Sequence, residues 1–135
     1  MRWNLCKRTL PSPADKGNDT DAPCNVLVVD DDRLVNWVVK EWVEAAGCRA
    51  LIAENAVQAL EALKSTVPVR VMVTDFRMLV FDGNELIREA LKLRPDLDII
   101  IMTDHALPPY LLSRYQVLQK PFHPAELEAA LSQRC

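Results

Sequence analysis

The chain has 135 residues, 50% hydrophobic and 26% charged, with a formal net charge of -3, which fits one globular domain rather than a disordered or fibrous chain. It has no long basic run, no apolar stretch of roughly 18 residues and no apolar centre of a signal peptide. We therefore expect a cytoplasmic protein that binds neither nucleic acid nor a membrane directly.

The first part of the chain differs from the rest in composition. Residues 11–23, PSPADKGNDTDAP, are polar and rich in Pro, Asp and Gly, so they cannot bury much apolar surface. We expect a disordered leader over residues 1–24 and one folded domain over residues 25–135. The four cysteines form no Cys-x-x-Cys pair, so we expect reduced thiols rather than a metal site or a disulfide framework.

From residue 25 the sequence alternates short apolar runs with segments of helical period. The expected strands are 26–29, 48–54, 69–74, 99–102 and 116–119. Helical spacing covers 34–46, 57–63 and 86–91, with a short helix after Pro109 and a last helix from Pro124. Asn55 and Gln58 resemble a capping box, and Trp37 is expected to flank the core. Strands that alternate with single helices predict a parallel sheet with helices on both faces.

Polar side chains follow four of the predicted strands. They are Asp30, Asp31 and Asp32 after the first, Asp75 after the third, Thr103 after the fourth and Lys120 after the fifth. Ligands of such sheets bind at the carboxyl ends of the strands, so these groups should share one edge. Adjacent carboxylates repel each other, by roughly 4 kcal/mol at about 4 Å and an effective dielectric near 20. A positive partner is therefore expected, and their oxygen ligands suit Mg²⁺.

This arrangement resembles the receiver domain of two-component response regulators. The resemblance rests on Asp30-Asp31, TDFRMLVFDG after the third strand, IIIMTD at the fourth and QKPF at the fifth, and it covers residues 25–133. It implies an α/β fold with a doubly wound, five-stranded parallel sheet in the order 2-1-3-4-5. The fourth helix should be shortened, because two prolines interrupt it.

The resemblance also implies roles for individual residues. Asp75 would be the phosphoacceptor, Thr103 the switch hydroxyl and Lys120 the contact to a phosphoryl oxygen. A cis Lys120-Pro121 peptide would aim the lysine.

The implied cofactor is Mg²⁺. Asp31 and Asp75 would bind it directly, Asp30 through water, and the backbone carbonyl of Arg77 would complete the protein ligands. Asp32 is expected instead to cap the following helix.

The implied function is that of a single-domain response regulator, since no effector domain follows the last predicted helix, and the receiver portion of a hybrid kinase stays open as the alternative. A partner histidine kinase or histidine phosphotransfer protein would supply the phosphoryl group, and phosphorylation would switch a protein-binding surface. The chain would be a monomer or weak dimer. It would be a self-phosphorylating switch with autodephosphorylation rather than a turnover enzyme.

Several positions depart from the family pattern. Leu79 replaces a usual proline, and Asp104 replaces the small residue after the switch threonine, where a carboxylate opposes an incoming anion unless it turns to solvent. The switch aromatic is replaced by Val117, with Tyr115 or Tyr110 as substitutes.

Two other functions stay open. One is a pseudo-receiver that binds partners without phosphorylation, which Leu79 and Asp104 favour. The other is a haloacid-dehalogenase-like phosphatase with Asp30 and Asp32 as its Asp-x-Asp motif. That phosphatase needs further acids after the lysine, where only Glu126 and Glu128 follow.

Overall fold

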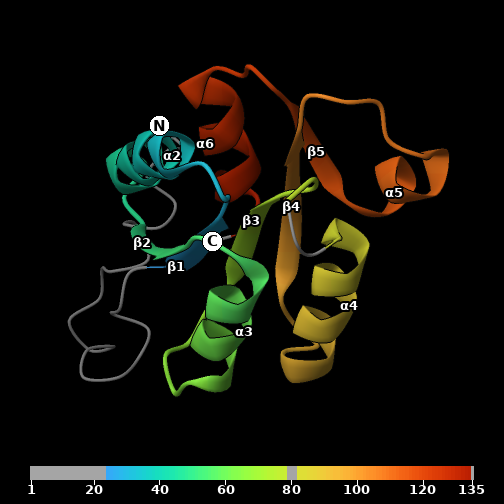
Figure 1. The fold of residues 1–135 in the computed structure, drawn as a ribbon. Helices are drawn as coiled ribbons and strands as arrows, with labels where there is room; N and C mark the ends of the chain where they lie inside the picture. Colours follow the sequence, from blue (N-terminus) through green and yellow to red (C-terminus); the bar gives the residue numbers. More distant parts are fainter. Residues whose placement is uncertain (1–23, 79–81, 135) are drawn as a thin grey trace.

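The computed structural model describes residues 24–78 and 82–134, which form an α/β fold (Figure 1). Five parallel strands stand in the order β2-β1-β3-β4-β5, so the predicted fold class and strand order are confirmed. The strands are β1 (Asn25–Val29), β2 (Arg49–Ala53), β3 (Val71–Asp75), β4 (Asp98–Thr103) and β5 (Gln116–Gln119). Leu79 and the predicted leader, apart from Cys24, lie outside the described residues.

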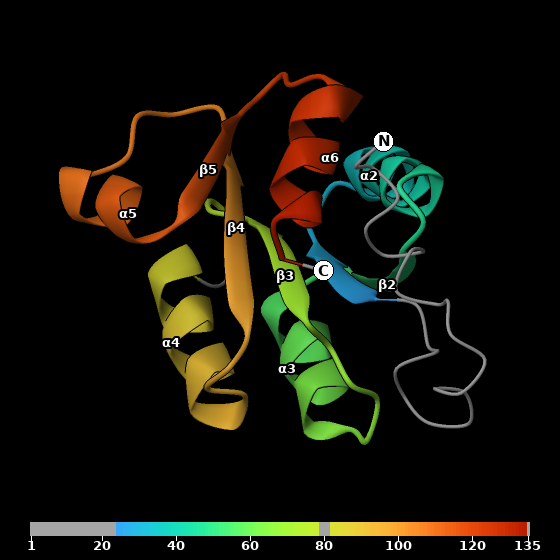
Figure 2. The ribbon, with the colours of Figure 1, turned by 180° about the vertical axis from the view of Figure 1, so that it is seen from behind.

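Helices cover both faces of the sheet. Those in the described residues are α2 (Arg33–Ala45), α3 (Ala56–Lys64), α4 (Gly83–Leu93), α5 (Pro109–Arg114) and α6 (Pro124–Ser132). Helices α2 and α6 lie together on one face, and α3 and α4 lie together on the other (Figures 1 and 2). Helix α5 is the fourth of these helices and has only 6 residues, which confirms the predicted shortening of the fourth helix. Pro108 and Pro109 stand at its start, since proline fits only the first turn of a helix.

The central strands form the rigid platform of the site. In β1, Val26 and Val28 face the α2 and α6 side, whereas Leu27 and Val29 face the α3 and α4 side. Successive side chains of a strand point to opposite faces, so a strand covered on both sides needs a continuous apolar run. Each such side chain contributes about 1.5–3 kcal/mol when it is fully buried.

Local polar residues set the starts of two helices. The side chain of Asp32 accepts a hydrogen bond of 2.9 Å from the backbone N–H of Leu34, so its predicted capping role is confirmed. Asn55 accepts one of 2.8 Å from the backbone N–H of Gln58. The Gln58 side chain in turn accepts one of 2.8 Å from the N–H of Glu54, which is the predicted capping box with its return bond one residue earlier.

Two expectations about side chains are wrong. Trp37 is 58% exposed, because it lies one position beyond Asn36, which starts the buried stripe of α2. Cys24 and Cys48 are both disulfide-bonded, so they are not reduced thiols. Within the two described ranges, every helix is too short or too polar to cross a bilayer.

Candidate functional site

Three carboxylates meet at the carboxyl ends of β1 and β3. Asp30 and Asp31 follow β1, and Asp75 is the last residue of β3. The strand order reverses between β1 and β3, which makes this edge the switch point where sheets of this kind bind ligands. One oxygen atom from each of the three carboxylates lies within 4.8 Å of the others. The structure therefore brings these three predicted residues together.

Lys120 brings a positive charge to the carboxylates from the end of β5. Its Nζ atom donates hydrogen bonds of 3.1 Å to Oδ2 of Asp30 and 3.1 Å to Oδ1 of Asp75. The Lys120-Pro121 peptide is cis, as the family resemblance implied. Lys120 thus supplies one positive charge to the acidic cluster, and the expected Mg²⁺ stays a prediction.

Burial and charge shift the pKa values of this cluster. Burial, followed by the negative charge of Asp30, raises the pKa of Asp75 to about 6, although Lys120 opposes the shift. Burial also raises the pKa of Asp30. Burial alone would lower the pKa of Lys120, but the charges of Asp30 and Asp75 outweigh it and raise that pKa. One ammonium group does not fully offset two buried carboxylates, so the cluster favours a further cation.

Thr103 lies buried at the end of β4, with its hydroxyl turned to the following loop. The hydroxyl accepts a hydrogen bond of 3.1 Å from the backbone N–H of His105 and lies 3.4 Å from the carbonyl oxygen of His105, to which it donates. The carbonyl of Thr103 accepts a hydrogen bond of 2.7 Å from the backbone N–H of Lys120. The main chains of the predicted switch and the lysine are therefore joined directly.

Asp104 turns its side chain toward solvent. The side chain is 65% exposed, and its Oδ1 atom lies 2.6 Å from Nδ1 of His105. This is the orientation in which a carboxylate opposes an incoming anion least.

Backbone contacts join the residues just after β3 to those at the start of α4. Arg77 pairs with Asp82 in an antiparallel bridge, and Gly83 donates a backbone hydrogen bond of 3.1 Å to the carbonyl of Phe76. A Cβ atom at position 83 would lie 2.5 Å from that carbonyl oxygen, so only glycine fits without a shift. The role of the Arg77 carbonyl as a metal ligand stays a prediction.

The aromatic substitutes predicted for Val117 differ in position. Tyr115 and Val117 both pack, half-buried, against the core on the α3 and α4 side. Tyr110 is exposed, and its hydroxyl accepts a hydrogen bond of 3.1 Å from the side-chain amide of Asn84. Tyr115 is therefore the aromatic side chain placed most like an inward-facing switch residue.

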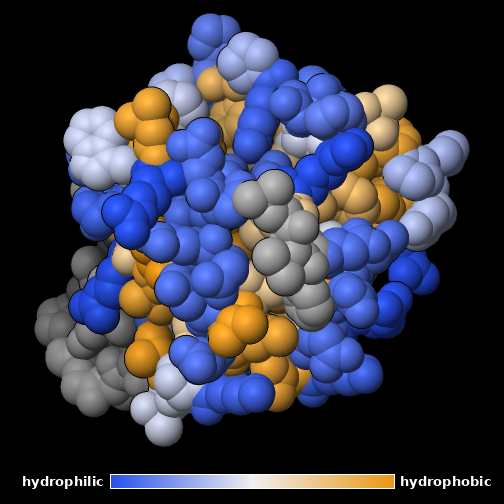
Figure 3. All heavy atoms as spheres, viewed as in Figure 1, coloured by the Kyte–Doolittle hydropathy of each residue, from blue (hydrophilic) through white to orange (hydrophobic). Residues whose placement is uncertain are grey.

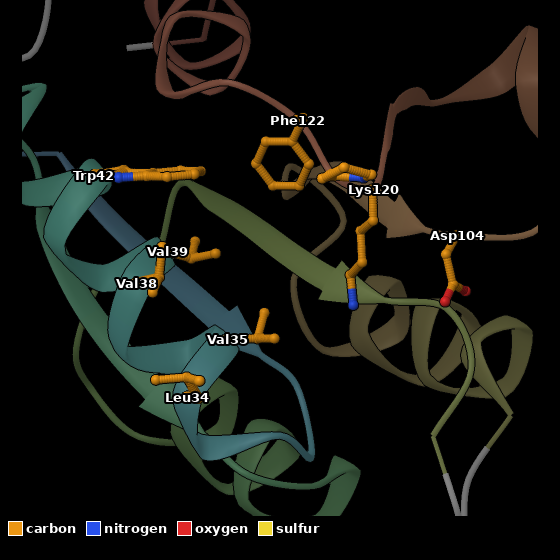
Figure 4. Close-up of a pocket in the computed structure, with 9 residues that line it drawn as sticks. Leu34, Val35, Val38, Val39, Trp42, Asp104, Lys120 and Phe122 are labelled. Carbon is orange, nitrogen blue, oxygen red and sulfur yellow. The ribbon is translucent and has the colours of Figure 1, made fainter.

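An apolar groove of about 460 Å³ lies beside Lys120, between α2 and the loop that joins β5 to α6. The rings of Trp42 and Phe122 pack edge to face in it, with centroids 5.7 Å apart, and Asp104 lies with Lys120 on the side away from Trp42 (Figure 4). Leu34, at the start of α2, lines the groove and is itself exposed. Figure 3 shows a largely hydrophilic face on which hydrophobic residues reach the surface in several places, among them over α2 and over α3.

We did not predict roles for Asn36 and Gly83 from the sequence. The signal for Asn36 is a polar residue within the buried stripe of a helix, where Val39 and Val43 are its companions. The signal for Gly83 is a glycine at the first position of a helix, close after a candidate phosphoacceptor.

Comparisons of sequence and structure point to one family. The sequence model of the response regulator receiver domain matches residues 26–132. The DNA-binding transcriptional regulator NtrC from Escherichia coli (strain K12) is 37% identical over 102 residues, which is 72% of this chain. The chain spans only 22% of the length of that curated relative.

Two solved structures have the same fold. A response regulator receiver protein from Sinorhizobium medicae has a TM-score of 0.75 and 27% identity, covering 85% of this chain and 95% of that one. The response regulator TrrA from Thermotoga maritima, solved in complex with Mg(2+)-BeF, has a TM-score of 0.70 and 24% identity. That alignment covers 82% of this chain and 97% of TrrA.

Proposed function

This chain belongs to the response regulator receiver family, and we propose that it accepts a phosphoryl group on Asp75 in the presence of Mg²⁺. The observation that carries the proposal is the convergence of Asp75 with Asp30, Asp31 and Lys120 at one edge of the sheet. These residues come from β1, β3 and the end of β5. The three carboxylates can bind a cation, and the ammonium group of Lys120 can contact a phosphoryl oxygen, as phosphoryl transfer to a carboxylate requires.

The donor set fits Mg²⁺. Carboxylate oxygens from three residues lie within 4.8 Å of one another, and this hard cation takes oxygen ligands at about 2.0–2.1 Å while it keeps several waters. Asp31 and Asp75 would hold it directly, Asp30 through water, and the carbonyl of Arg77 would complete the set. When bound, the ion supplies positive charge beside the transferring phosphoryl group. TrrA, a protein of the same fold, was solved in complex with Mg(2+)-BeF, which supports the proposal of Mg²⁺ as the cofactor.

The proposed chemistry is attack by a carboxylate oxygen of Asp75 on the phosphorus of a phosphohistidine. A P–O bond forms, the N–P bond breaks, and the electron pair returns to the imidazole nitrogen of the partner. Lys120 stabilises the charge that spreads over the phosphoryl oxygens. With a pKa of about 6, Asp75 is mostly ionised at neutral pH and can act as the nucleophile.

Thr103 is the proposed switch. Its hydroxyl is held by His105 and must leave these bonds to reach a phosphoryl oxygen, so the loop with Asp104 and His105 would move with it. A shift of a population from 1:99 to 99:1 takes about 5.5 kcal/mol. A group of charge near -2 supplies much of this through charge-assisted hydrogen bonds.

Incubation with acetyl phosphate and Mg²⁺, followed by intact mass measurement, tests the proposal. We expect one phosphoryl group on the wild type, none on Asp75→Asn and none on the wild type in EDTA. Asp82→Asn is the matched control, because Asp82 is an exposed carboxylate at the start of α4 whose capping bond to Asn84 an asparagine retains. Phosphorylation of Asp75→Asn to the wild-type extent would contradict the assignment of the acceptor.

The same experiment tests the pseudo-receiver alternative, because a wild-type protein that stays unmodified would support it. The phosphatase alternative needs a separate incubation with a phosphate monoester in place of acetyl phosphate. Continuous turnover of that ester would be expected from a haloacid-dehalogenase-like phosphatase, which leaves Asp75 without a role although it lies among the acids.

The proposal also covers the partner, the location and the oligomeric state of this domain. A histidine kinase or histidine phosphotransfer protein is the proposed partner, without direct contact of this domain to nucleic acid or a membrane. Action as a cytoplasmic, single-domain protein, monomeric or weakly dimeric, stays a prediction. Sedimentation with and without phosphoryl donor measures the oligomeric state.

A further inference from the structure

Asn36 is a polar side chain in the buried stripe of α2 and is 2% exposed. Its companions on the stripe are Val39 and Val43. Burial of an amide without hydrogen bonds costs about 1–3 kcal/mol relative to water. An asparagine therefore persists at such a position only with buried partners.

The partners of Asn36 are two backbone carbonyls at the carboxyl ends of β1 and β2. Its Nδ2 atom donates hydrogen bonds of 2.7 Å to the carbonyl of Asp30 and 3.2 Å to the carbonyl of Ala53. The carbonyl of Ala53 also accepts a hydrogen bond of 3.2 Å from the N–H of Asp30. One side-chain amide thus fastens the carboxyl ends of β1 and β2 to the first turn of α2.

The hydrogen bond from Asn36 to the carbonyl of Asp30 fixes the direction in which the acidic residues point. The carbonyl of Asp30 belongs to the peptide group that leads into Asp31, so fixing its oxygen fixes the direction in which Asp31 leaves the strand. The side chain of Asp30 is held at the same time, because its Oδ1 atom accepts a hydrogen bond of 2.9 Å from the N–H of Asp32.

The orientation of the Asn36 amide follows from its neighbours. A flipped amide would place Oδ1 against two carbonyl oxygens, so only the donating orientation satisfies them. The Oδ1 atom is buried and has no hydrogen-bond partner in the part of the chain that the structure describes. The amide therefore holds the two carbonyls through its donor atoms.

We propose that Asn36 is a positioning residue that aims Asp30 and Asp31 at the bound Mg²⁺, a proposal that rests on the proposed function. Groups behind metal ligands that fix their orientation typically change metal affinity 10- to 100-fold when they are removed. Asn36 acts in this way through the backbone of the strand end.

Asn25 provides a matched control at the other end of β1. It is 6% exposed, its Nδ2 atom donates a hydrogen bond of 2.6 Å to the carbonyl of Pro68, and its buried Oδ1 atom has no partner among the described residues. It shares residue type and burial with Asn36 and also donates its Nδ2 to a backbone carbonyl, although it makes one such bond where Asn36 makes two. It lies at the amino end of the strand, about 17 Å from the acids at roughly 3.3 Å per residue.

The experiment compares Asn36→Leu with Asn25→Leu by calorimetric titration with Mg²⁺. We expect the Mg²⁺ dissociation constant to rise about 10- to 100-fold for Asn36→Leu and to stay within about twofold of the wild type for Asn25→Leu, although both variants melt at lower temperature. At saturating Mg²⁺ the phosphorylation rate of Asn36→Leu should return toward the wild-type rate. Equal dissociation constants for Asn36→Leu and the wild type would overturn the proposal.

A second measurement needs no substitution, in case Asn36→Leu does not fold. In ¹⁵N-labelled wild-type protein, the side-chain amide signals of Asn36 should shift as Mg²⁺ saturates the site, whereas those of Asn25 should not. Unchanged Asn36 signals at saturation would overturn this proposal alone. A wild-type protein that binds no Mg²⁺ would overturn the proposed function and this inference with it.

Discussion

The Nζ atom of Lys120 lies 3.1 Å from Oδ1 of Asp75, although 45 positions separate the two residues. The lysine side chain is 22% exposed and the aspartate side chain 11%, so water screens the contact only in part. The same ammonium group also binds Asp30. Two buried carboxylates therefore share one positive charge, and the stability of this edge depends on that charge.

Replacement of Lys120 by methionine leaves two buried carboxylates unopposed. In EDTA at neutral pH, we expect Lys120→Met to lower the free energy of unfolding by about 1–3 kcal/mol, because a hydrogen-bonded charge partner is lost. Mg²⁺ should stabilise the variant more than the wild type, since the ion replaces the missing charge. Urea unfolding with and without Mg²⁺ measures both effects. Lys64→Met, at an exposed lysine of α3, should change stability by less than about 0.5 kcal/mol.

The raised pKa of Asp75 predicts a pH dependence of stability in metal-free protein. Folded Asp75 keeps its proton up to a pH of about 6, whereas the ordinary value is 3.8. Between these values the folded state binds more protons than the unfolded state, so this group's contribution to stability falls as pH rises. The loss is complete above pH 6 and amounts to about 2–3 kcal/mol. Burial of Asp30 acts in the same direction.

The effect is measured as the difference in unfolding free energy between Asp75→Asn and the wild type in EDTA. The unfolding free energy of Asp75→Asn should rise relative to that of the wild type by about 2–3 kcal/mol between pH 4 and pH 6 and should then level off. Use of the difference cancels the titration of the carboxylates that do not interact with Asp75, whereas Asp30, which does interact with it, contributes to the measured difference. A difference that stays constant across the window, or moves the other way, would count against the raised pKa.

The sequence carried enough information for the fold and for the edge where the acids meet. Continuous apolar runs such as Val26–Val29 predict strands covered on both faces, and each run ends on a polar residue. Asp75 and Lys120 therefore had to lie at the same edge once the sheet was parallel. The helix caps at Asp32 and Asn55 are local and could be predicted for the same reason.

Contacts between distant segments could not be predicted in this way. The bond from Asn36 to Ala53 depends on how α2 lies across the ends of two strands. The exposure of Trp37 depends on which face of α2 it occupies, and a difference of one residue in the helical pattern changes that face. The disulfide bonding of Cys24 and Cys48 depends on distances in space, which spacing along the chain does not give.

Gly83 is expected to resist substitution although it lies in a helix, where alanine is usually favoured by about 1 kcal/mol. A Cβ atom there would lie 2.5 Å from the carbonyl oxygen and 2.7 Å from a ring carbon of Phe76. Gly83→Ala should therefore destabilise the protein by about 1–3 kcal/mol and displace the loop after Asp75. Thermal or urea unfolding measures the loss, with Arg88→Ala at an exposed position of α4 as the control. A more stable Gly83→Ala protein would show that the loop yields without cost.

Asp104 is expected to slow phosphorylation even though its side chain turns toward solvent, because its carboxylate still lines the groove together with Lys120 and repels an incoming anion. Two unit charges about 8 Å apart interact by roughly 0.5 kcal/mol in water and about 2 kcal/mol at an effective dielectric of 20. Asp104→Ala should therefore speed phosphorylation by acetyl phosphate by about two- to thirtyfold. The rate is followed by intact mass. Decay of the phosphorylated protein is measured separately after the donor is removed, so that slower loss of the phosphoryl group is not mistaken for faster phosphorylation. Asp96→Ala, an exposed acid before β4, should leave the rate unchanged, and an equal or lower rate for Asp104→Ala would mean that its carboxylate does not act on the phosphoryl site.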